Sequence, residues 1–324
     1  MIRHLKKNAT NLTLLLFTLF LLMVLNAGAA SAMDPRFTDK DGDLIADIPS
    51  DPKQWVDPAT LIFAYTPVED PAVYVEVWRE FLDHMAKVTG KRVQFFPVQS
   101  NAAQLEAMRA GRLHIAGFNT GSNPIAVACA GFRPFTIMAK ADDSYGYEME
   151  IITYPGSGIT TLADLKGRTL AFTSETSNSG FKAPQALLEA EFGLAVNRDY
   201  KPAFSGAHDN SILGVANKDY DAAAIANSVL TRMEARGVVN RKDLATVYKS
   251  GTFPTTGYGV VYNLHPELQK KVQEAFFTFD WTGTGLEKEF SPQGEAKFLP
   301  ITFKEHWAVI RQIDAAMGVK YTCN

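Results

Sequence analysis

Apolar runs alternate with amphipathic repeats along most of the chain. Residues 61–65 form an apolar run of strand length, and in residues 72–89 apolar side chains recur every three to four positions, as in an amphipathic helix. Gly90 follows directly, at a position where a left-handed helix cap favours glycine. The pattern then repeats as a strand, a helix and a strand over residues 93–96, 102–110 and 113–116. This βαβαβ order predicts a mostly parallel sheet with helices on both faces.

A second unit of the same style begins after the turn at residues 154–156. It contains expected strands at residues 169–172 and 222–226, and expected helices at residues 180–192, 211–217 and 228–236. The remaining elements are too few for a third domain, and we expect them to return to the first unit. They cover residues 260–262, 266–279 and 306–317.

These elements predict an α/β protein of two lobes. The first lobe is expected to comprise residues 59–151 and 258–324, and the second residues 152–257. The chain would then cross between the lobes near residues 151–155 and 254–258. Paired crossings act as a hinge, and lobes of this kind bind ligands in the cleft at the carboxyl ends of their strands. We therefore expect a ligand between the lobes and closure about the hinge.

The first 32 residues have the order of a secretory signal peptide. Three basic residues precede an apolar run over residues 12–25, and Ala30, Ser31 and Ala32 follow it. The apolar run is shorter than the ~20 residues that are needed to span a bilayer. Cleavage after Ala32 predicts a soluble, periplasmic protein, and the lack of a cysteine at this point argues against a lipid anchor.

The composition narrows the classes of protein. The chain has 324 residues, of which 46% are hydrophobic and 21% charged, as is ordinary for a globular protein. This length is large for one core, which supports two lobes. The net charge is -3 and the basic residues are scattered, so neither nucleic acid nor a polybasic membrane contact is expected. Any anion site must therefore be local.

The two cysteines, Cys129 and Cys323, are too few and too far apart for a zinc ribbon or a redox motif. In an oxidising compartment they can form a disulfide that holds the C-terminal tail. The alternative is one buried thiol and one thiol in the tail.

An acidic extension, residues 33–58, precedes the first lobe. Within it Asp39, Asp41, Asp43 and Asp47 surround a glycine, an arrangement that converges the hard oxygen ligands that Ca²⁺ requires. The spacing lacks the glycine placement and final glutamate of an EF-hand, and resembles the short aspartate loops of thrombospondin-type repeats. A solvated acidic linker is the alternative. No cofactor is required by the function inferred below, and Ca²⁺ is the one candidate.

The segment 173–181, Thr-Ser-Glu-Thr-Ser-Asn-Ser-Gly-Phe, follows a predicted strand and enters a predicted helix. The free backbone N–H groups and the dipole at a helix start attract an oxyanion, and short hydroxyl and amide side chains add donors. Pro184 must lie near the first turn, where a missing N–H is tolerated. The pattern predicts a site for a phosphorus oxyanion. The alternative is ordinary helix capping by Ser177 or Ser179.

This segment resembles that of the phosphonate-binding proteins of ABC importers, which have the type II periplasmic binding fold. In that family a serine-rich segment followed by Gly-Phe and a proline grips the phosphonate oxygens. Further matches cover almost the whole chain beyond the aspartate loop and keep the family's order. They are residues 101–109, Ile115-Ala116 before Phe118-Asn119, Gly146-Tyr147, residues 206–218 and Asp221-Ala222-Ala223.

The resemblance assigns roles to individual residues. Ser177, Asn178 and Ser179 fall on the oxyanion-binding segment, Tyr147 on a ligand-contacting tyrosine and His208 on a ligand-contacting histidine. All five can donate a hydrogen bond. A hinge-packing aromatic and a helix-capping histidine are the alternatives for the last two.

The chain departs from the resembled family in the residues expected around the rest of the ligand. Asn101 stands where the family can carry a tyrosine, and Ser228 and Thr255 or Thr256 stand where aminoalkylphosphonate binders place carboxylates. A buried ammonium without a counter-charge is costly, so an aminophosphonate would need another acid from the cleft.

Four acids are candidates for that role. Glu148 and Asp209 adjoin predicted ligand-binding residues, whereas Glu69 and Asp70 are weaker candidates that we expect to be solvated surface charges. Two aromatic residues at strand ends, Tyr65 and Phe118, are expected either to wall the cleft around a short alkyl group or to belong to the core.

The resemblance implies a periplasmic receptor that captures a phosphonate, such as 2-aminoethylphosphonate or an alkylphosphonate, or a related phosphorus oxyanion. The expected partners are an ABC permease and its ATPase in the inner membrane, and the receptor is expected to be a monomer. Alternatives are a receptor for phosphate, phosphite or a sulfonate, or an enzyme on the same two-lobed fold. The sequence has no Gly-x-Ser-x-Gly or His-Glu-x-x-His motif, which argues against an enzyme. A sensory module would need a membrane span after the lobes, and none is expected here.

Overall fold

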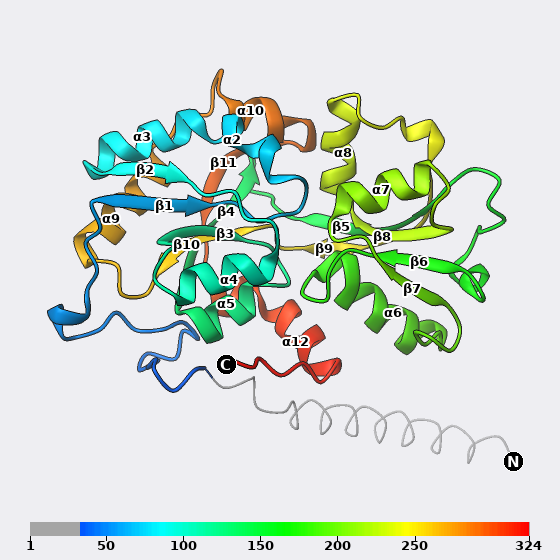
Figure 1. Ribbon diagram of the computed structural model, residues 1–324, viewed down its shortest axis with the longest axis horizontal. Coiled ribbons are helices and arrows are strands. Elements are labelled where there is room, and N and C mark those ends of the chain that lie inside the picture. The colour runs from blue at the N-terminus through cyan, green and yellow to red at the C-terminus, as the bar shows by residue number, and fades with distance from the viewer. Residues whose placement is uncertain (1–32, 324) are drawn as a thin grey trace, which may run out of the picture.

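Two α/β lobes lie side by side in the computed structural model, which describes residues 33–323 (Figure 1). The expected signal peptide therefore lies outside the described residues. Among the residues that are described, no helix combines the length and the apolar character needed to cross a membrane.

The first lobe is built on a six-stranded sheet with the order β11-β4-β10-β3-β1-β2. Helices α3 and α9 pack together on one face of this sheet, and α4 and α5 lie on the other (Figure 1). The strands are β1 (Thr60–Ala64), β2 (Arg92–Phe95), β3 (Ile115–Phe118), β4 (Phe132–Lys140), β10 (Gly257–Val261) and β11 (Glu295–Pro300). The helices are α2 (Tyr74–Val77), α3 (Arg79–Thr89), α4 (Asn101–Arg109), α5 (Asn123–Ala130), α9 (Pro266–Phe277), α10 (Gly285–Phe290) and α11 (Phe303–His306).

The second lobe is built on a five-stranded sheet with the order β7-β6-β8-β5-β9. Helices α7 and α8 lie on one face and α6 on the other (Figure 1). The strands are β5 (Tyr147–Thr153), β6 (Thr169–Phe172), β7 (Lys201–Phe204), β8 (Ala222–Ala226) and β9 (Ala245–Phe253). The helices are α6 (Ala183–Phe192), α7 (His208–Ala216) and α8 (Asn227–Ala235).

The predicted two-lobed α/β class is confirmed: most strands of each sheet run in one direction, and a minority run antiparallel to them. β1 is parallel to β2 and β3, and β6 is parallel to β7 and β8. β10, β11 and β5 are antiparallel to their neighbours. The reason is topological. β5 and β10 begin at the crossings between the lobes and run away from them, whereas β4 and β9 end at the crossings. A strand that begins at a crossing therefore runs antiparallel to a neighbouring strand that ends at one.

The first crossing lies earlier than predicted. The chain leaves the first sheet at the end of β4 and enters the second at the start of β5, so residues 141–146 form the crossing. The predicted boundary after residue 151 falls inside β5, all of which pairs with the second sheet. The second crossing, residues 254–256 between β9 and β10, is close to the predicted place.

The two crossings run close together at Gly146. This residue has a φ of 107°, and a Cβ atom on it would lie 2.5 Å from the carbonyl oxygen of Phe253, the last residue of β9. A side chain here would therefore be strained and would push the crossings apart. Thr120 of the first lobe adds a hydrogen bond of 2.7 Å from its hydroxyl to the carbonyl of Pro254. The geometry is that of a narrow double-stranded hinge.

The C-terminal segment touches both lobes, whereas we expected it to return to the first. β10, α9 and β11 do return, but α12 (Ala308–Ala316) contacts α6 and the turn η4 (Asn178–Lys182) of the second lobe. An ion pair of 2.8 Å between Lys182 and Asp314 fixes this contact. A disulfide between Cys129 and Cys323, the pairing that the sequence allowed, then ties the tail to α5 of the first lobe.

The helix expected over residues 72–89 consists of three consecutive segments. A 3-10 turn, Pro71–Val73, precedes α2 and α3, and Trp78 separates these two helices. Gly90 ends α3 with a φ of 71°, in the left-handed conformation that its position predicted. Trp78 is fully buried against Phe63 and Phe81 in the aromatic core of the first lobe.

Candidate functional site

A small cavity lies between the lobes and is lined by both. Its volume is about 50 Å³, enough for roughly three to five water-sized groups. The strands that end here include β1, β6 and β8, as expected for a ligand site of this fold class. Seven of the ten predicted ligand-binding residues line this cavity: Tyr65, Asn101, Tyr147, Ser177, Asn178, Ser179 and His208.

The serine-rich segment between β6 and α6 is held in place by its own hydrogen bonds. Ser177 accepts a hydrogen bond of 3.0 Å from the N–H of Gly180 and so caps the turn η4. Pro184 has no N–H to give the Gly180 carbonyl, and this oxygen accepts instead from the N–H of Thr173, at 3.0 Å. The predicted helix start at residue 180 is therefore a π-turn over residues 178–182, followed by α6. We call residues 173–179 the cradle.

Gly180 is the residue that makes this close fold possible. A Cβ atom on it would overlap the hydroxyl of Thr173 and lie 2.8 Å from that of Ser177. The capping role of Ser177 and its place in the cavity lining coexist, because a hydroxyl that accepts from an N–H still has a proton to donate.

Two buried polar atoms of the cradle lack a hydrogen-bond partner among residues 33–323. The hydroxyl of Thr173 and the Oδ1 atom of Asn178 form no hydrogen bond within the described part of the chain, although both residues line the cavity. Asn178 Nδ2 donates to the hydroxyl of Tyr147, at 3.2 Å. A buried polar group without a partner costs about 1–3 kcal/mol, so these atoms favour a polar occupant of the cavity.

His208 supplies a neutral donor at the start of α7. Its Nδ1 atom accepts from the N–H of Ala226 at 3.2 Å, which places the proton of the neutral ring on Nε2. Burial lowers the pKa of His208 to about 4. The ring is thus uncharged at neutral pH and can donate a hydrogen bond without adding a positive charge.

Asn101 of the first lobe bridges to the cradle of the second. Its Nδ2 atom donates to the hydroxyls of Ser174 at 3.3 Å and Thr176 at 2.9 Å, and its Oδ1 atom accepts from Asn119 at 2.8 Å. Nearby, a Cβ atom on Gly121 would overlap the carbonyl of Thr176, so only glycine lets the lobes meet this closely. Asn101 therefore holds the lobes together at the rim of the cavity.

The two aromatic residues at strand ends differ. Tyr65 lines the cavity and packs on Tyr74 with ring centroids 4.5 Å apart. Phe118 does not line it: the side chain is fully buried against Phe132, at 4.8 Å, and belongs to the core. Of the two alternatives given for these residues, Phe118 follows the second because its side chain points into the lobe.

Glu69 is not the solvated surface charge that we expected. It is buried and pairs across the lobes with Arg232, at 2.9 Å, and with Arg236. Burial opposes ionisation of Glu69, but the two guanidinium groups outweigh it and lower its pKa. Asp70 is exposed, as expected, and caps the turn that follows by accepting from the N–H of Ala72.

The other two candidate acids lie outside the cavity lining. Glu148 is half-buried, accepts from Asn227 at 3.2 Å and lies 3.8 Å from the amine of Lys249. Asp209 accepts from the backbone N–H of Asp70, at 3.2 Å.

Sequence reasoning missed several lining residues, three of which contribute a charge or an amide to the charged side of the cavity. These three are Arg232 on α8, Gln293, and Glu295 at the start of β11. Glu295 accepts from Gln293 Nε2 at 2.8 Å, and burial raises its pKa to about 7. No local pattern marks these positions. Gln293 lies in a Ser-Pro-Gln-Gly turn, and the strand β11, which begins with Glu295, was not predicted.

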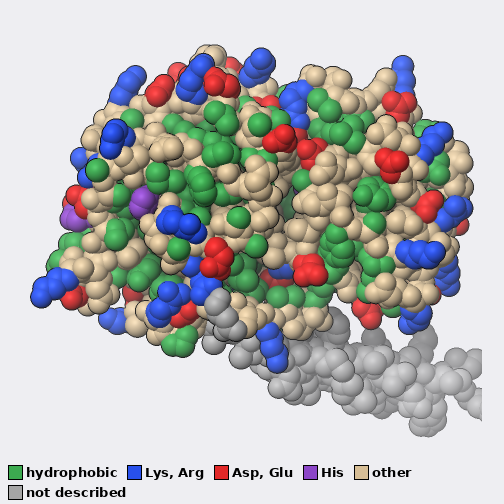
Figure 2. Space-filling view, viewed as in Figure 1, with side chains coloured by type: hydrophobic (Ala, Val, Ile, Leu, Met, Phe, Trp, Pro, Cys, Tyr) green, Lys and Arg blue, Asp and Glu red, His purple; other side chains and the backbone are tan. Residues whose placement is uncertain are grey.

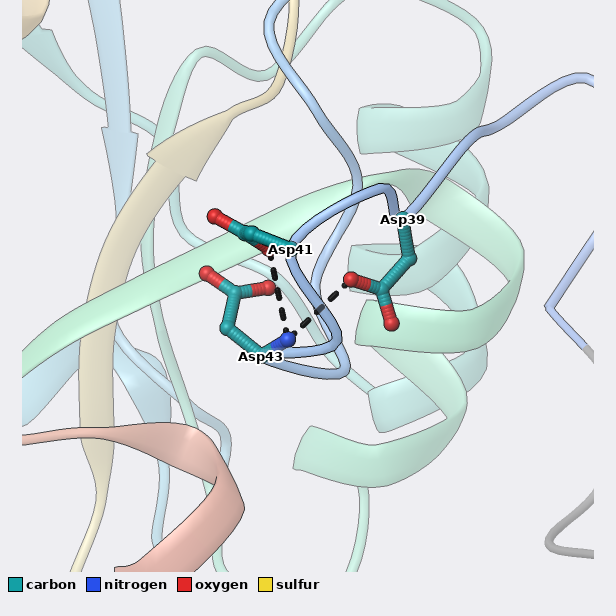
Figure 3. Close-up of side chains that lie close together, drawn as sticks. All are labelled: Asp39, Asp41 and Asp43. Carbon is teal, nitrogen blue, oxygen red and sulfur yellow. Dashed lines mark hydrogen bonds between the residues drawn. The ribbon is translucent and has the colours of Figure 1, made fainter.

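The aspartate loop brings three of its four predicted ligands together. Oxygens of Asp39, Asp41 and Asp43 all lie within 4.8 Å of one another (Figure 3). The N–H of Asp43 donates to Asp39 at 3.1 Å and to Asp41 at 3.3 Å. Asp47 is absent from this group, because its carboxylate accepts instead from the hydroxyl of Thr38 at 2.7 Å.

The outer surface agrees with a local anion site. Figure 2 shows Lys and Arg side chains dispersed among Asp and Glu on the face in view, with no single basic patch. The polar groups suited to an oxyanion lie instead inside the cavity.

Two hinged α/β lobes with a donor-lined cavity between them define a two-lobed ligand-binding protein. The comparison with family models gives the class in more detail: the family described as "ABC transporter, phosphonate, periplasmic substrate-binding protein" matches residues 63–307. The chain belongs to this family, which the sequence resemblance had predicted.

Individual relatives agree with this membership. The chain is 27% identical over 286 residues to the "Phosphate-import protein PhnD" of Mycolicibacterium smegmatis, covering 82% of this chain and 86% of the relative. It is 29% identical over 211 residues to the "Phosphonates-binding periplasmic protein" of Escherichia coli, covering 63% of this chain and 62% of the relative. The family is one of substrate-binding proteins of transporters, so the chain is a binding protein and not an enzyme.

Solved structures show the same fold. A binding protein of an ABC phosphonate transporter from Pseudomonas aeruginosa superposes with a TM-score of 0.72 at 24% identity, covering 80% of this chain and 86% of that chain. A PhnD protein of Prochlorococcus marinus in complex with methylphosphonate gives a TM-score of 0.70 at 17% identity, covering 81% of this chain and 100% of that chain.

Proposed function

We propose that this protein is the periplasmic receptor of an ABC importer that captures a phosphonate by closure of its two lobes and delivers it to the permease. The observation that carries the proposal is the cradle, whose hydroxyl and amide groups line a cavity between the lobes at the start of a helix. Family membership supports the transport role.

The cradle would hold the oxyanion with dipoles alone. Ser177, Ser179, Tyr147 and the Nε2–H of His208 are neutral donors, and the turn at the helix start adds backbone N–H groups. Hydrogen bonds to a charged group contribute about 1.5–3 kcal/mol each, so a few of them supply the −8 to −12 kcal/mol of a micromolar to nanomolar receptor.

Phosphate is the second candidate ligand, because one relative is named for phosphate import. Both ligands are small tetrahedral oxyanions and both suit a cavity of about 50 Å³. They differ in one group, since a phosphonate presents a carbon where phosphate presents a fourth oxygen. Tyr65 and Phe290, two aromatic residues of the lining, favour the carbon-bearing ligand.

Calorimetry on the purified protein would test the proposal. We expect methylphosphonate or 2-aminoethylphosphonate to bind at least tenfold more tightly than phosphate, and sulfate to bind weakly or not at all. Tighter binding of phosphate would make phosphate the ligand in place of a phosphonate, and the role as a receptor of an importer would stand. Binding of none of these oxyanions would overturn the proposed function.

Export through the signal peptide and a monomeric state complete the proposal. Binding of Ca²⁺ by the aspartate loop stays a prediction, supported by the convergence of Asp39, Asp41 and Asp43. The hydrogen bonds that Asp39 and Asp41 accept within the loop would hold the same geometry without an ion. A calcium titration followed by a thermal melt distinguishes these two cases.

A further inference from the structure

Five buried or partly buried charged side chains gather where α8 of the second lobe meets the first lobe. We call this set the charge cluster: Glu69, Arg232, Arg236, Glu289 and Glu295. Two of its members, Arg232 and Glu295, line the cavity.

Both arginines of the cluster are already paired. Arg232 lies 2.9 Å from Glu69 and 3.4 Å from Glu289, and Arg236 pairs with the same two carboxylates. Arg232 also donates to Gln293 at 3.0 Å. Two guanidinium groups thus balance Glu69 and Glu289, and no positive charge of the cluster is left over.

Glu295 is the third carboxylate and has no cation of its own. Its only hydrogen bond among the described residues comes from Gln293, at 2.8 Å, and no ion pair to it occurs within residues 33–323. Lys140 pairs with Glu295 only as a backbone neighbour on β4, and its side chain is exposed. Glu295 itself is only 8% exposed. A buried carboxylate without a cation is unfavourable, so this site lacks one positive charge.

We propose that Glu295 binds the ammonium group of the ligand, which makes a short aminoalkylphosphonate the preferred substrate class. The inference rests on the proposed function: the cradle takes the phosphonate oxygens, and the ligand's own cation completes the charge cluster. Glu295 lies on β11 of the first lobe and the cradle lies in the second, so a zwitterion would bridge the lobes. The carboxylate expected at Ser228 and at Thr255 or Thr256 is then supplied from another strand.

The protonation of Glu295 agrees with this assignment. Burial raises its pKa to about 7, while Arg232, the hydrogen bond from Gln293 and Lys140 oppose the rise. Glu69 and Glu289 lie in the same cluster, and their negative charge is balanced by the arginines. With this pKa, Glu295 is partly protonated near pH 7, and a bound ammonium group would favour its charged form.

The test compares two ligands of equal length, 2-aminoethylphosphonate and propylphosphonate, by calorimetry on the wild type and on Glu295→Gln. At pH 8 we expect Glu295→Gln to weaken binding of the aminophosphonate about 100-fold and of propylphosphonate less than threefold. Equal loss for both ligands, or loss for neither, would overturn the assignment.

A matched control and a wild-type measurement keep the test decisive. Glu148→Gln makes the same change at a carboxylate outside the cavity lining and should alter neither affinity. If it, and not Glu295→Gln, weakens the aminophosphonate selectively, Glu148 is the partner and the assignment is wrong. If Glu295→Gln does not fold, the wild type alone suffices.

In the wild type, the ratio of the affinity for aminophosphonate to that for propylphosphonate should fall about 30-fold from pH 8.5 to 5.5, as Glu295 becomes protonated. A ratio independent of pH would contradict the assignment. Wild-type protein that binds neither these two ligands nor methylphosphonate would overturn the proposed function itself, whereas tight binding of propylphosphonate or methylphosphonate without 2-aminoethylphosphonate would overturn only the role of Glu295.

Discussion

The cradle and the charge cluster meet the same cavity but use opposite electrostatics. The cradle presents neutral hydroxyl and amide groups, His208 adds a neutral imidazole to the cavity lining, and the nearby Lys182 is buried against Asp314 and does not line the cavity. The charge cluster uses full charges from both lobes. Dipoles fixed by the backbone can hold an anion over a wide pH range. The electrostatic energy of a cluster of full charges instead changes with pH and with the loss of the partner of any member. On the proposed function, the cradle would hold the oxyanion, whereas the charge cluster would join the lobes and bind the rest of the ligand.

The largest expected effect comes from removing the cradle's hydroxyls. Ser177→Ala combined with Ser179→Ala removes two hydrogen bonds to a charged oxyanion, and we expect binding of any phosphonate to weaken by about 3–6 kcal/mol. Calorimetry measures this loss, and Ser50→Ala, at an exposed serine, is the control. Stability should fall only by the ~1 kcal/mol of a lost helix cap. Undiminished affinity would remove the cradle from the site.

Breaking the charge cluster should act on stability first. Arg232→Gln leaves Glu69 and Glu289 with a single guanidinium between them, and we expect the free energy of unfolding to fall by about 3–5 kcal/mol. Urea unfolding measures the change, with the exposed Arg112→Gln as the matched control. A loss no greater than that of the control would show that the cluster contributes nothing to the stability of the fold.

Glu295 and His208 should give opposite pH dependences that partly cancel in the ligand-free protein. The pKa of Glu295 is raised from 4.5 to about 7, so it stabilises the fold below pH 4.5, and this contribution of about 3 kcal/mol is lost as the pH rises through 7. The pKa of His208 is lowered from 6.5 to about 4, so it contributes a similar amount above pH 6.5 that is lost as the pH falls through 4.

Single variants would separate the two contributions. Glu295→Gln keeps His208 and should become more stable as the pH rises from 4 to 6.5. His208→Gln keeps Glu295 and should become less stable as the pH rises from 4.5 to 7. Thermal melts across this range measure both slopes, and the wild type should lie between them. Slopes of the same sign in both variants would contradict the opposite pKa shifts of His208 and Glu295.

The cradle was predictable from sequence because it is local. A strand, a run of hydroxyl and amide residues, Gly180 and Pro184 occur within a few residues of one another, and each has a direct conformational meaning. The helix end at Gly90 was predictable for the same reason, since it depends on one residue and its neighbours.

The charge cluster was not predictable because its members are far apart in the chain. Glu69 and Arg232 are separated by 163 residues, and nothing near Glu69 distinguishes a buried ion pair from a solvated carboxylate. The position of the first crossing was missed because β5 contains both polar and apolar residues and pairs only with strands that come later in the chain. Long-range antiparallel pairing leaves no local pattern.

The disulfide between Cys129 and Cys323 would link the maturation of an exported protein to the oxidising compartment that it enters. It closes a loop of 194 residues, and by chain entropy such a crosslink stabilises a fold by about 5 kcal/mol. Chains that are exported before their thiols are oxidised would reach the oxidising side without this crosslink. The last residues would then be secured only after translocation, so the finished molecule would form where its ligand is found and not where it is synthesised.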